Sequence, residues 1–375
     1  MNADVVIHGA GIIGCAIARE VAAGGLSVVV VERNRPGEEA SGAAAGLLTP
    51  QSHASSPGPL ADLGRASLDL YPALARELAE ETSIDVDLRM SGSVRIAADE
   101  DDERELAELF EWQDGAGWRL ARLDAEGLAR RTVGALHPRF RAGLEFSDEG
   151  SVDCRLLVRA LWKSARARGA RFRLGESVRA LAFSGDRCTG VVTDAETIGA
   201  RVVVDAAGPW AGLLGGLPVS IPVRPVRGQI VELVAEDVPF PFPVSWRDFY
   251  VVPRAGGRVL LGSTQEEAGF DKRVTAGAVA LLIARAVEVL PRLRAARFSG
   301  AWAGLRPASP DSLPLLGESG VPGLLIATGH FRNGILLAPV TARALAALIL
   351  GRDPPVSLEP FRVERFAFAP RNESW

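Results

Sequence analysis

Three glycines and one acid near the start of the chain have the spacing of a dinucleotide-binding fingerprint. Gly9, Gly11 and Gly14 form a GxGxxG sequence, and Glu32 follows eighteen residues after Gly14. The first glycine allows a tight turn, the second lets the backbone approach a pyrophosphate, and the third lets a helix pack closely against a strand. The acid is placed to accept hydrogen bonds from ribose hydroxyls. A carboxylate there also argues against NADP, because it would repel the extra phosphate.

The surrounding sequence supplies the elements that such a turn needs. Residues 4–8 are predicted to form a short buried strand, residues 15–24 a helix and residues 27–31 a second strand. A helix N-terminus offers free N–H groups and partial positive charge to phosphates. A lone GxGxxG could be a ligand-free turn, but strand, helix, second strand and acid together favour a dinucleotide site. The small residues at 41–46 indicate either a tight packing turn or a second wall for the dinucleotide.

The composition excludes several functional classes. The chain of 375 residues is 47% hydrophobic, which indicates a globular protein, and its net charge of −4 gives no reason to expect nucleic acid. The longest apolar tract is too short to span a bilayer and no signal peptide is visible, so we expect a cytoplasmic protein without a membrane partner. The cysteines and histidines lack the spacing of disulfide frameworks or metal sites, so no metal is predicted. They are Cys15, Cys154, Cys188, His8, His53, His137 and His330.

Changes of pattern along the chain predict an α/β fold with two domains. A predicted strand at 201–210 runs into Ala207-Gly208 and, beside the N-terminal fingerprint, fits an FAD fold. We expect an FAD-binding Rossmann-like domain from residues 1–85, 150–218 and 305–375. An inserted α+β substrate domain, built on a mixed, largely antiparallel sheet, is expected from residues 86–149 and 219–304. Further expected elements are helices at 60–82, 99–114, 123–131, 153–167, 276–290 and 335–350, and strands at 86–90, 92–97, 227–233, 248–253, 258–263, 297–303 and 324–328.

Several later segments resemble the flavin amine oxidases of the D-amino acid oxidase superfamily, most closely the glycine oxidases. The strongest match is GHFRNGILLAP at 329–339, followed by WAGLRP at 302–307 with PLLG at 314–317. Segments 41–48, 250–254 and 361–365 are also similar to that family. The resemblance covers nearly the whole chain in the same order.

The resemblance implies non-covalently bound FAD and oxidation of a small amino acid. It places Arg306 on the substrate carboxylate with help from the Tyr250 hydroxyl, and Arg332 in the same active site; a bidentate guanidinium suits a carboxylate. From sequence alone, both arginines could instead be surface charges, Tyr250 could be a core residue, and His330 is given no catalytic role. The implied cofactor-binding residues are Gly9, Gly11, Ile12, Ile13, Gly14, Glu32, Arg33, Ser41, Ala44, Ala45, Gly46, Leu47, Val178, Ala207, Gly208, Trp210, Arg306, His330, Arg332, Asn333, Gly334, Ile335 and Leu336.

The reaction implied by the resemblance is oxidative deamination. Hydride passes from the neutral amine of glycine, or of a similarly small amine, to flavin N5, and oxygen then reoxidises the flavin to give hydrogen peroxide. The imine hydrolyses to glyoxylate and ammonia, and in the family this chemistry supplies the thiazole of thiamine. The predicted helix near Gly334 would direct its N-terminus at the negative charge of the reduced flavin. Family members are often homo-oligomers.

Two departures from the glycine oxidase pattern leave the substrate open. Gln265 stands where the family has a methionine near the substrate, and Asp248 stands where it has a histidine two residues before Tyr250. Sarcosine, D-alanine, D-proline or another amine therefore stay as alternatives. A dehydrogenase that passes electrons to a quinone is a rival interpretation, as is a non-catalytic or tRNA-modifying flavoprotein. A covalent sarcosine oxidase is disfavoured because no cysteine follows Cys188.

Overall fold

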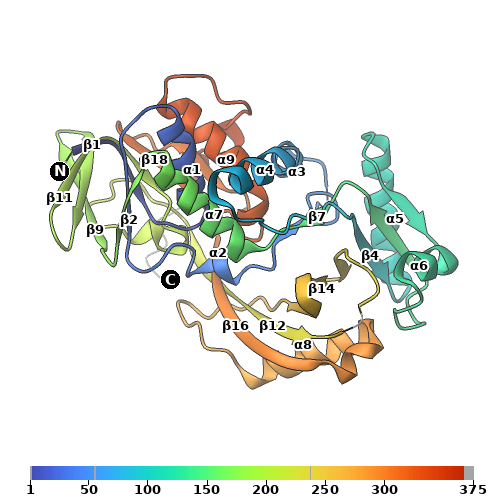
Figure 1. Cartoon of the computed structure of the whole chain (residues 1–375). Helices are drawn as coiled ribbons and strands as arrows, with labels where there is room; N and C mark the ends of the chain where they lie inside the picture. Colours follow the sequence, from blue (N-terminus) through green and yellow to red (C-terminus); the bar gives the residue numbers. More distant parts are fainter. Residues whose placement is uncertain (1, 55, 237, 367–375) are drawn as a thin grey trace.

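Two large sheets organise the chain (Figure 1). The structure is a computed structural model, and it describes residues 2–54, 56–236 and 238–366. The first sheet has the strand order β17-β18-β11-β1-β2-β8, and an antiparallel hairpin of β9 and β10 continues from β11. These strands are β1 (Asn2–His8), β2 (Val28–Glu32), β8 (Arg171–Leu174), β9 (Val178–Ser184), β10 (Arg187–Thr193), β11 (Thr197–Asp205), β17 (Leu315–Glu318) and β18 (Leu324–Thr328).

The register of the first sheet brings four strand ends to one edge. β1 lies parallel to β2 and β11, and its His8 is paired with both Val31 and Asp205. β18 is in turn parallel to β11, with Ile326 opposite Asp205. The helix α1 (Ile12–Ala23) makes the crossover from β1 to β2. The loops that follow these four strands therefore meet at the carboxyl edge, where doubly wound sheets bind ligands.

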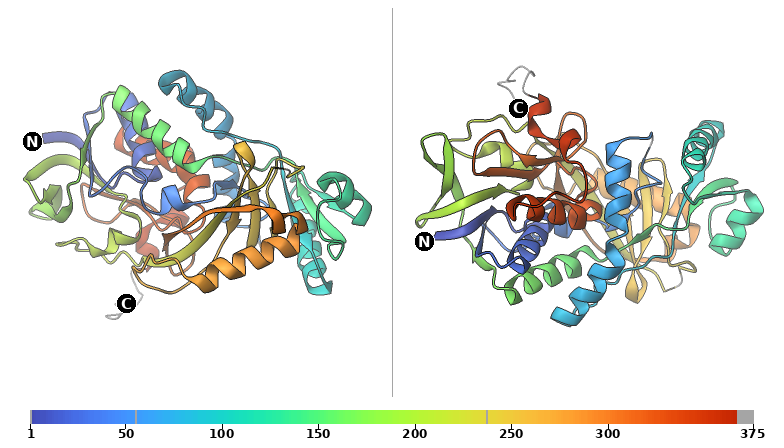
Figure 2. Two further views of the ribbon diagram at one scale, coloured as in Figure 1. Left: turned by 60° about the horizontal axis from the view of Figure 1, so that its bottom comes forward. Right: turned by 90° about the horizontal axis from the view of Figure 1, so that it is seen from above.

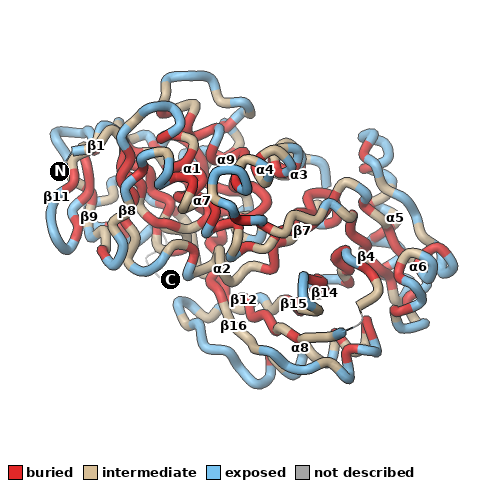
Figure 3. The backbone as a smooth tube through the Cα atoms, viewed as in Figure 1, coloured by how far each residue is buried: buried red, intermediate tan, exposed pale blue. Residues whose placement is uncertain are grey.

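Alternating apolar residues bury both faces of the first sheet. Val5 and Ile7 of β1 pack toward the helices α1, α7 (Cys154–Ala167) and α9 (Gly334–Ile349). Val6 points the opposite way, into a cluster that includes the β9-β10 hairpin and the short helix η1 (Gly208–Leu213). Figure 3 shows the resulting concentration of buried backbone around β1, α1 and α9. Successive side chains of a strand point to opposite faces of the sheet, and both faces are covered here. This explains why the strands are rich in valine along their whole length.

The second sheet is mixed but largely antiparallel, as expected, with the order β16-β12-β15-β14-β13-β4-β6-β5. Its one parallel pair is β13 with β4. The helix α8 (Ala276–Val289) packs along it through Leu282, Ala286 and Val289 (Figure 2), and α5 (Glu100–Gly115) and α6 (Ala125–Thr132) lie at the β4 end (Figure 1). The strands are β4 (Ser93–Ala97), β5 (Ala121–Leu123), β6 (Ala142–Phe146), β12 (Arg224–Val234), β13 (Val244–Trp246), β14 (Phe249–Pro253), β15 (Arg258–Gly262) and β16 (Arg297–Ala308).

The remaining elements lie outside the two large sheets. They are α2 (Ala40–Ala43), β3 (Leu47–Leu48), α3 (Pro59–Leu68), α4 (Tyr71–Thr82), β7 (Gly150–Ser151), η2 (Ala255–Gly257), η3 (Pro291–Ala295), η4 (Glu359–Phe361) and η5 (Val363–Phe366). In the parts of the chain that the structure describes, every helix is too short or too polar to traverse a bilayer. The predicted α/β class is confirmed. The division into two domains stays a prediction, and its boundary at 304/305 falls inside β16.

Four element predictions differ most from the structure in extent. The expected helix at 60–82 is two helices, because Pro72 has no N–H to donate to Leu68 and its ring disfavours continuation. The expected strand at 86–90 makes a single bridge, at Arg89, since Asp87 adopts a φ of +51°. The strand predicted at 201–210 ends at Asp205, where the chain turns into η1. The strand predicted at 297–303 continues to Ala308 because β12 pairs with it along that length.

Candidate active site

A cavity of about 570 Å³ lies at the carboxyl edge of the first sheet, and residues of β12, β14 and β16 line its other side. Every residue predicted to bind cofactor or substrate lines this cavity except Gly14. Those that line it are Gly9, Gly11, Ile12, Ile13, Glu32, Arg33, Ser41, Ala44, Ala45, Gly46, Leu47, Val178, Ala207, Gly208, Trp210, Tyr250, Arg306, His330, Arg332, Asn333, Gly334, Ile335 and Leu336. The fold thus gathers them from both ends of the chain, while their individual roles stay predictions.

The glycine turn has the close contacts that its sequence predicts. Gly9 has a φ of +100°, and a Cβ atom there would lie 2.8 Å from the Ala206 carbonyl oxygen. A Cβ atom on Gly14 would lie 2.0 Å from the carbonyl oxygen of Gly9, so Gly14 permits helix–turn packing without facing the cavity. The Ser41 hydroxyl accepts a hydrogen bond of 2.9 Å from the Ile12 N–H in the first turn of α1. The turn and the small-residue segment are therefore fixed to each other.

Glu32 is held rigidly at the end of β2. One carboxylate oxygen accepts a hydrogen bond of 2.8 Å from the Ala10 N–H, and the other accepts one of 2.9 Å from the Asn34 N–H. Each carboxylate oxygen has further lone pairs, so the group can still accept from ribose hydroxyls. Beside it, the Arg33 guanidinium stacks on the Trp210 ring, with its central carbon 3.7 Å from the ring centroid.

The segment at 41–46 forms a packing turn and also lines the cavity. The guanidinium of Arg254, only 5% exposed, donates to the carbonyl oxygen of Ala45 and, at 2.8 Å, to that of Val152. A Cβ atom on Gly46 would lie 1.9 Å from the Val152 carbonyl oxygen. The buried guanidinium thus joins the carbonyls of two separate segments, and this fixes the wall in place.

Arg306 and Tyr250 lie together on the second sheet. The Arg306 guanidinium donates at 3.0 Å to the Thr264 carbonyl oxygen and at 2.7 Å to the Ser263 hydroxyl. It covers Gly228, where a Cβ atom would lie 2.3 Å from it. Burial lowers the pKa of Arg306 from its usual value, and the Tyr250 oxygen opposes that shift.

Tyr250 presents a neutral hydroxyl to the cavity. Its ring covers Gly262, its partner in the β14–β15 register, where a Cβ atom would lie 2.4 Å from the ring. Burial raises the pKa of Tyr250, while Arg306 and a hydrogen bond with Ser263 act in the opposite direction. The hydroxyl therefore stays protonated at neutral pH and can donate a hydrogen bond.

The first turn of α9 is anchored from α3 and α4. Pro339 lacks the N–H that would bond to the Ile335 carbonyl, and the Tyr71 hydroxyl donates to that carbonyl instead. The Ser67 hydroxyl donates at 2.6 Å to the Leu336 carbonyl oxygen and accepts at 3.3 Å from the Val340 N–H. Two side chains thus hold the helix end that opens into the cavity.

His330 is buried beside the cavity. Its Nε2 atom lies 3.1 Å from the Thr341 hydroxyl, so a side chain satisfies this ring rather than the backbone. Burial lowers the pKa of His330 to about 3, so its imidazole is neutral at physiological pH. A neutral ring beside the cavity adds no charge to it.

Arg332 lies at the margin of the cavity. Its side chain is 37% exposed, and its Nη1 atom lies 3.5 Å from the Asp248 carboxylate. The two residues that depart from the family pattern, Asp248 and Gln265, are both absent from the described cavity lining, and Gln265 is exposed. Gln265 therefore does not alter the polarity of the cavity wall in this structure.

Several lining residues were not predicted from the sequence. They include His53, whose Nδ1 atom lies 2.7 Å from the Thr49 hydroxyl, and Ser263, which holds Arg306. Gly228 could have been found, because an isolated glycine within a predicted strand often marks the close approach of another group. For His53 the sequence carries no such signal.

The donor set of the cavity fits FAD. The N-termini of α1 and α9 both reach it, at Gly11 and Gly334, and helix N-termini favour phosphate groups and developing negative charge. Glu32 supplies acceptors for ribose hydroxyls, as described above. The residues present would hold the pyrophosphate at the Gly9–Gly11 turn and the isoalloxazine ring near Gly334.

Comparisons with known proteins agree with this fit. Residues 4–348 match the family model described as FAD dependent oxidoreductase (DAO). A glycine oxidase of Pseudomonas aeruginosa is 37% identical, over 96% of this chain and 98% of its own length. A bifunctional protein ThiO/ThiG of a Nostoc strain is 33% identical over 97% of this chain, which spans 55% of that protein.

A solved structure shows the same fold. The crystal structure of glycine oxidase from Geobacillus kaustophilus superposes with a TM-score of 0.93, at 34% identity, and the alignment covers 97% of this chain and 99% of that one. The sequence comparison and the structural comparison therefore indicate the same relatives along nearly the whole chain. The chain belongs to the FAD dependent oxidoreductase family of the D-amino acid oxidase type, and FAD is its cofactor.

Proposed function

We propose that this oxidoreductase deaminates glycine, or a similarly small amino acid, to glyoxylate and ammonia. The amine loses two electrons and two protons to become an imine, oxygen takes them up as hydrogen peroxide, and water hydrolyses the imine. The observation that carries the proposal is the buried Arg306 guanidinium beside the Tyr250 hydroxyl. Among the described residues, Arg306 has only neutral hydrogen-bond acceptors, so its charge is available to an incoming carboxylate.

The chain's own residues act by binding and orientation. Arg306 would bind the substrate carboxylate through a guanidinium fork, and the Tyr250 hydroxyl would donate to the same group. Fixing the carboxylate also fixes the adjacent α-carbon, which lowers the entropic part of the barrier. FAD, when bound, supplies the two-electron acceptor. The α-hydrogen leaves as hydride from the neutral amine, so the chain needs no catalytic base.

We further place the reaction in the cytoplasm, where it would supply the imine for the thiazole of thiamine. The likeness to the bifunctional protein ThiO/ThiG supports this setting. Oxygen as the acceptor and a homo-oligomeric state stay predictions.

A second candidate is an amine that carries a second anionic group. Arg332 lines the same cavity as Arg306, and its partner Asp248 is 81% exposed and 3.5 Å away. Such an exposed pair contributes little, so Arg332 could exchange Asp248 for a substrate carboxylate. A secondary amine with two carboxylates would then contact both guanidiniums.

The visible spectrum of the purified holoenzyme tests both candidates. Separate anaerobic samples of the holoenzyme receive glycine, sarcosine, D-alanine, D-proline or iminodiacetate. Each sample is then exposed to air. Bleaching of the oxidised flavin band by glycine, with recovery in air, supports the main proposal. Faster bleaching by iminodiacetate supports the second candidate. A flavoprotein that no small amine bleaches contradicts both, and slow recovery in air indicates an acceptor other than oxygen.

A further inference from the structure

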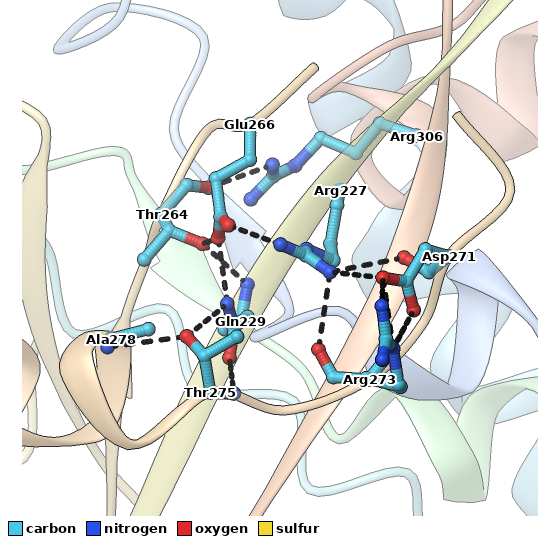
Figure 4. Close-up of polar contacts among 9 residues, drawn as sticks. All are labelled: Arg227, Gln229, Thr264, Glu266, Asp271, Arg273, Thr275, Ala278 and Arg306. Carbon is cyan, nitrogen blue, oxygen red and sulfur yellow. Dashed lines mark hydrogen bonds and ion pairs between the residues drawn. The ribbon is translucent and has the colours of Figure 1, made fainter. Parts of the chain in front are cut away.

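The loop that follows β15 holds Arg306 in place. Ser263 and Thr264 supply the two oxygen atoms that accept hydrogen bonds from the Arg306 guanidinium, at 2.7 and 3.0 Å. Figure 4 shows Arg306 pointing toward Thr264, with Glu266, Gln229 and Arg227 gathered around the same threonine. Arg306 lies on β16, whereas the loop belongs to the chain after β15, so the loop's position decides where the guanidinium fork points.

Glu266 fixes that loop to β12. One oxygen of its carboxylate accepts hydrogen bonds from the Thr264 hydroxyl at 2.5 Å and from the Gln229 amide at 2.7 Å. The other oxygen accepts one of 2.6 Å from Arg227 (Figure 4). Two backbone hydrogen bonds join the same positions, from the Arg227 N–H to the Glu266 carbonyl at 2.9 Å and in reverse at 3.0 Å. We call Glu266, Arg227, Gln229 and Thr264 the Glu266 network.

The Glu266 network is built around an ionised carboxylate. Arg227 and Gln229 are 8% and 1% exposed, so their donors need partners inside the protein. Burial favours the neutral form of Glu266, but hydrogen bonds from Thr264, Arg227 and Gln229 hold its pKa below the usual value. Thr264, Arg227 and Gln229 all donate hydrogen bonds to this carboxylate. If a glutamine replaced Glu266, the NH2 group of its amide would face one of these donors instead of an acceptor.

From this geometry we propose that Glu266 is a positioning residue that sets the affinity for the substrate carboxylate through the Thr264–Ser263 segment and Arg306. Glu266 is not among the residues that line the cavity and has no described contact with Arg306 itself. The inference rests on the proposed function, because it assumes that Arg306 binds a carboxylate.

The test compares Glu266→Gln with the wild-type holoenzyme. The probe is glycolate, a small carboxylate that lacks the amine, and its Kd is measured by calorimetry on the FAD-loaded protein. We expect the Kd for glycolate to rise roughly ten-fold, as for the loss of one charge-assisted hydrogen bond. The Kd for FAD should be unchanged, and the KM for the oxidised amine should rise more than kcat falls.

Glu267→Gln is the matched control. Glu267 is the next residue, its side chain is 65% exposed, and its ion pair with Arg224 lies outside the cavity. This variant should leave both affinities unchanged. Thr264→Val is the second test variant, since it removes one hydroxyl of the Glu266 network and keeps the side-chain shape. If Glu266→Gln does not load FAD, the glycolate Kd of Thr264→Val tests the positioning role instead.

The outcomes separate the two proposals. A glycolate Kd that is unchanged in Glu266→Gln, or that rises only in proportion to a lost FAD affinity, overturns the positioning role and leaves the proposed function intact. Wild-type holoenzyme that binds no glycolate and oxidises no small amine overturns the proposed function itself. A selective loss of glycolate affinity in Glu266→Gln, and none in Glu267→Gln, supports the inference.

Discussion

Replacement of Arg306 tests the substrate-binding role of the cavity most directly. In Arg306→Ala the positive charge disappears from a buried position, and the carboxylate of a bound amine loses its partner. Breaking such a buried pair costs about 3–5 kcal/mol, which corresponds to roughly 150- to 5,000-fold in kcat/KM. Arg306→Lys keeps the positive charge but loses the two parallel N–H donors of the guanidinium. Losing one charge-assisted hydrogen bond, about 1.5–3 kcal/mol, should lower kcat/KM roughly 10- to 150-fold.

The structure also predicts which kinetic step should change. Arg306 is held by Ser263 and Thr264 of the loop after β15, whereas the glycine turn and Glu32 are held by other contacts, so most of the FAD affinity should survive the substitution. Anaerobic stopped-flow reduction over a range of glycine concentrations separates the dissociation constant of glycine from the limiting rate, and the main loss is expected in the former. Arg224→Ala, on the neighbouring β12 and paired with an exposed acid, is the control. A kcat/KM for Arg306→Ala within about threefold of wild type would refute the assignment.

Three further substitutions probe other parts of the molecule. Gly14→Ala would place a Cβ atom 2.0 Å from a carbonyl oxygen of the turn; the variant should purify without FAD, and a normal flavin content would contradict the packing argument. Tyr71→Phe leaves a buried carbonyl of α9 without its donor, so calorimetry should show a loss of about 1–3 kcal/mol, or about 1–4 °C in Tm. Burial raises the pKa of Glu149 from 4.5 to about 7. The unfolded chain releases this proton first, so stability should fall by about 3 kcal/mol as pH rises from 4.5 to 7. Glu149→Gln should flatten that part of the profile in urea titrations at a series of pH values, and an unchanged slope would count against it.

The sequence predicts best what is encoded locally. The turn from Gly9 to Gly14 and the acid at Glu32 carry their own spacing, and the cap of α7 is readable because Asp153 directly precedes an amphipathic run. The break between α3 and α4 was also encoded, at Pro72, but the apolar period across it favoured one long helix. The spacing of apolar residues indicates which side chains face the core. It does not indicate that Pro72 lacks the N–H needed to continue the helix.

Contacts between distant segments were predicted only through family resemblance. Nothing near Arg306 indicates that its guanidinium would lie on Gly228 or be held by Ser263. The Glu266 network escaped prediction for the same reason, because a glutamate in a loop usually indicates a solvated surface. Strand order and register decide these contacts, and a single sequence does not contain them.

The central place of β1 in the first sheet shapes the biogenesis of the protein. β1 is translated before its partner β11, because the paired positions His8 and Asp205 are 197 residues apart, and the cavity also needs residues 329–336. A nascent chain therefore carries a valine-rich strand with an unpaired edge until β11 has been synthesised, a state that is prone to aggregation. The cavity is complete only once residues 329–336 have been synthesised, and FAD that binds the folded chain then draws the folding equilibrium forward by mass action. The folded fraction of this protein should therefore rise with the concentration of FAD.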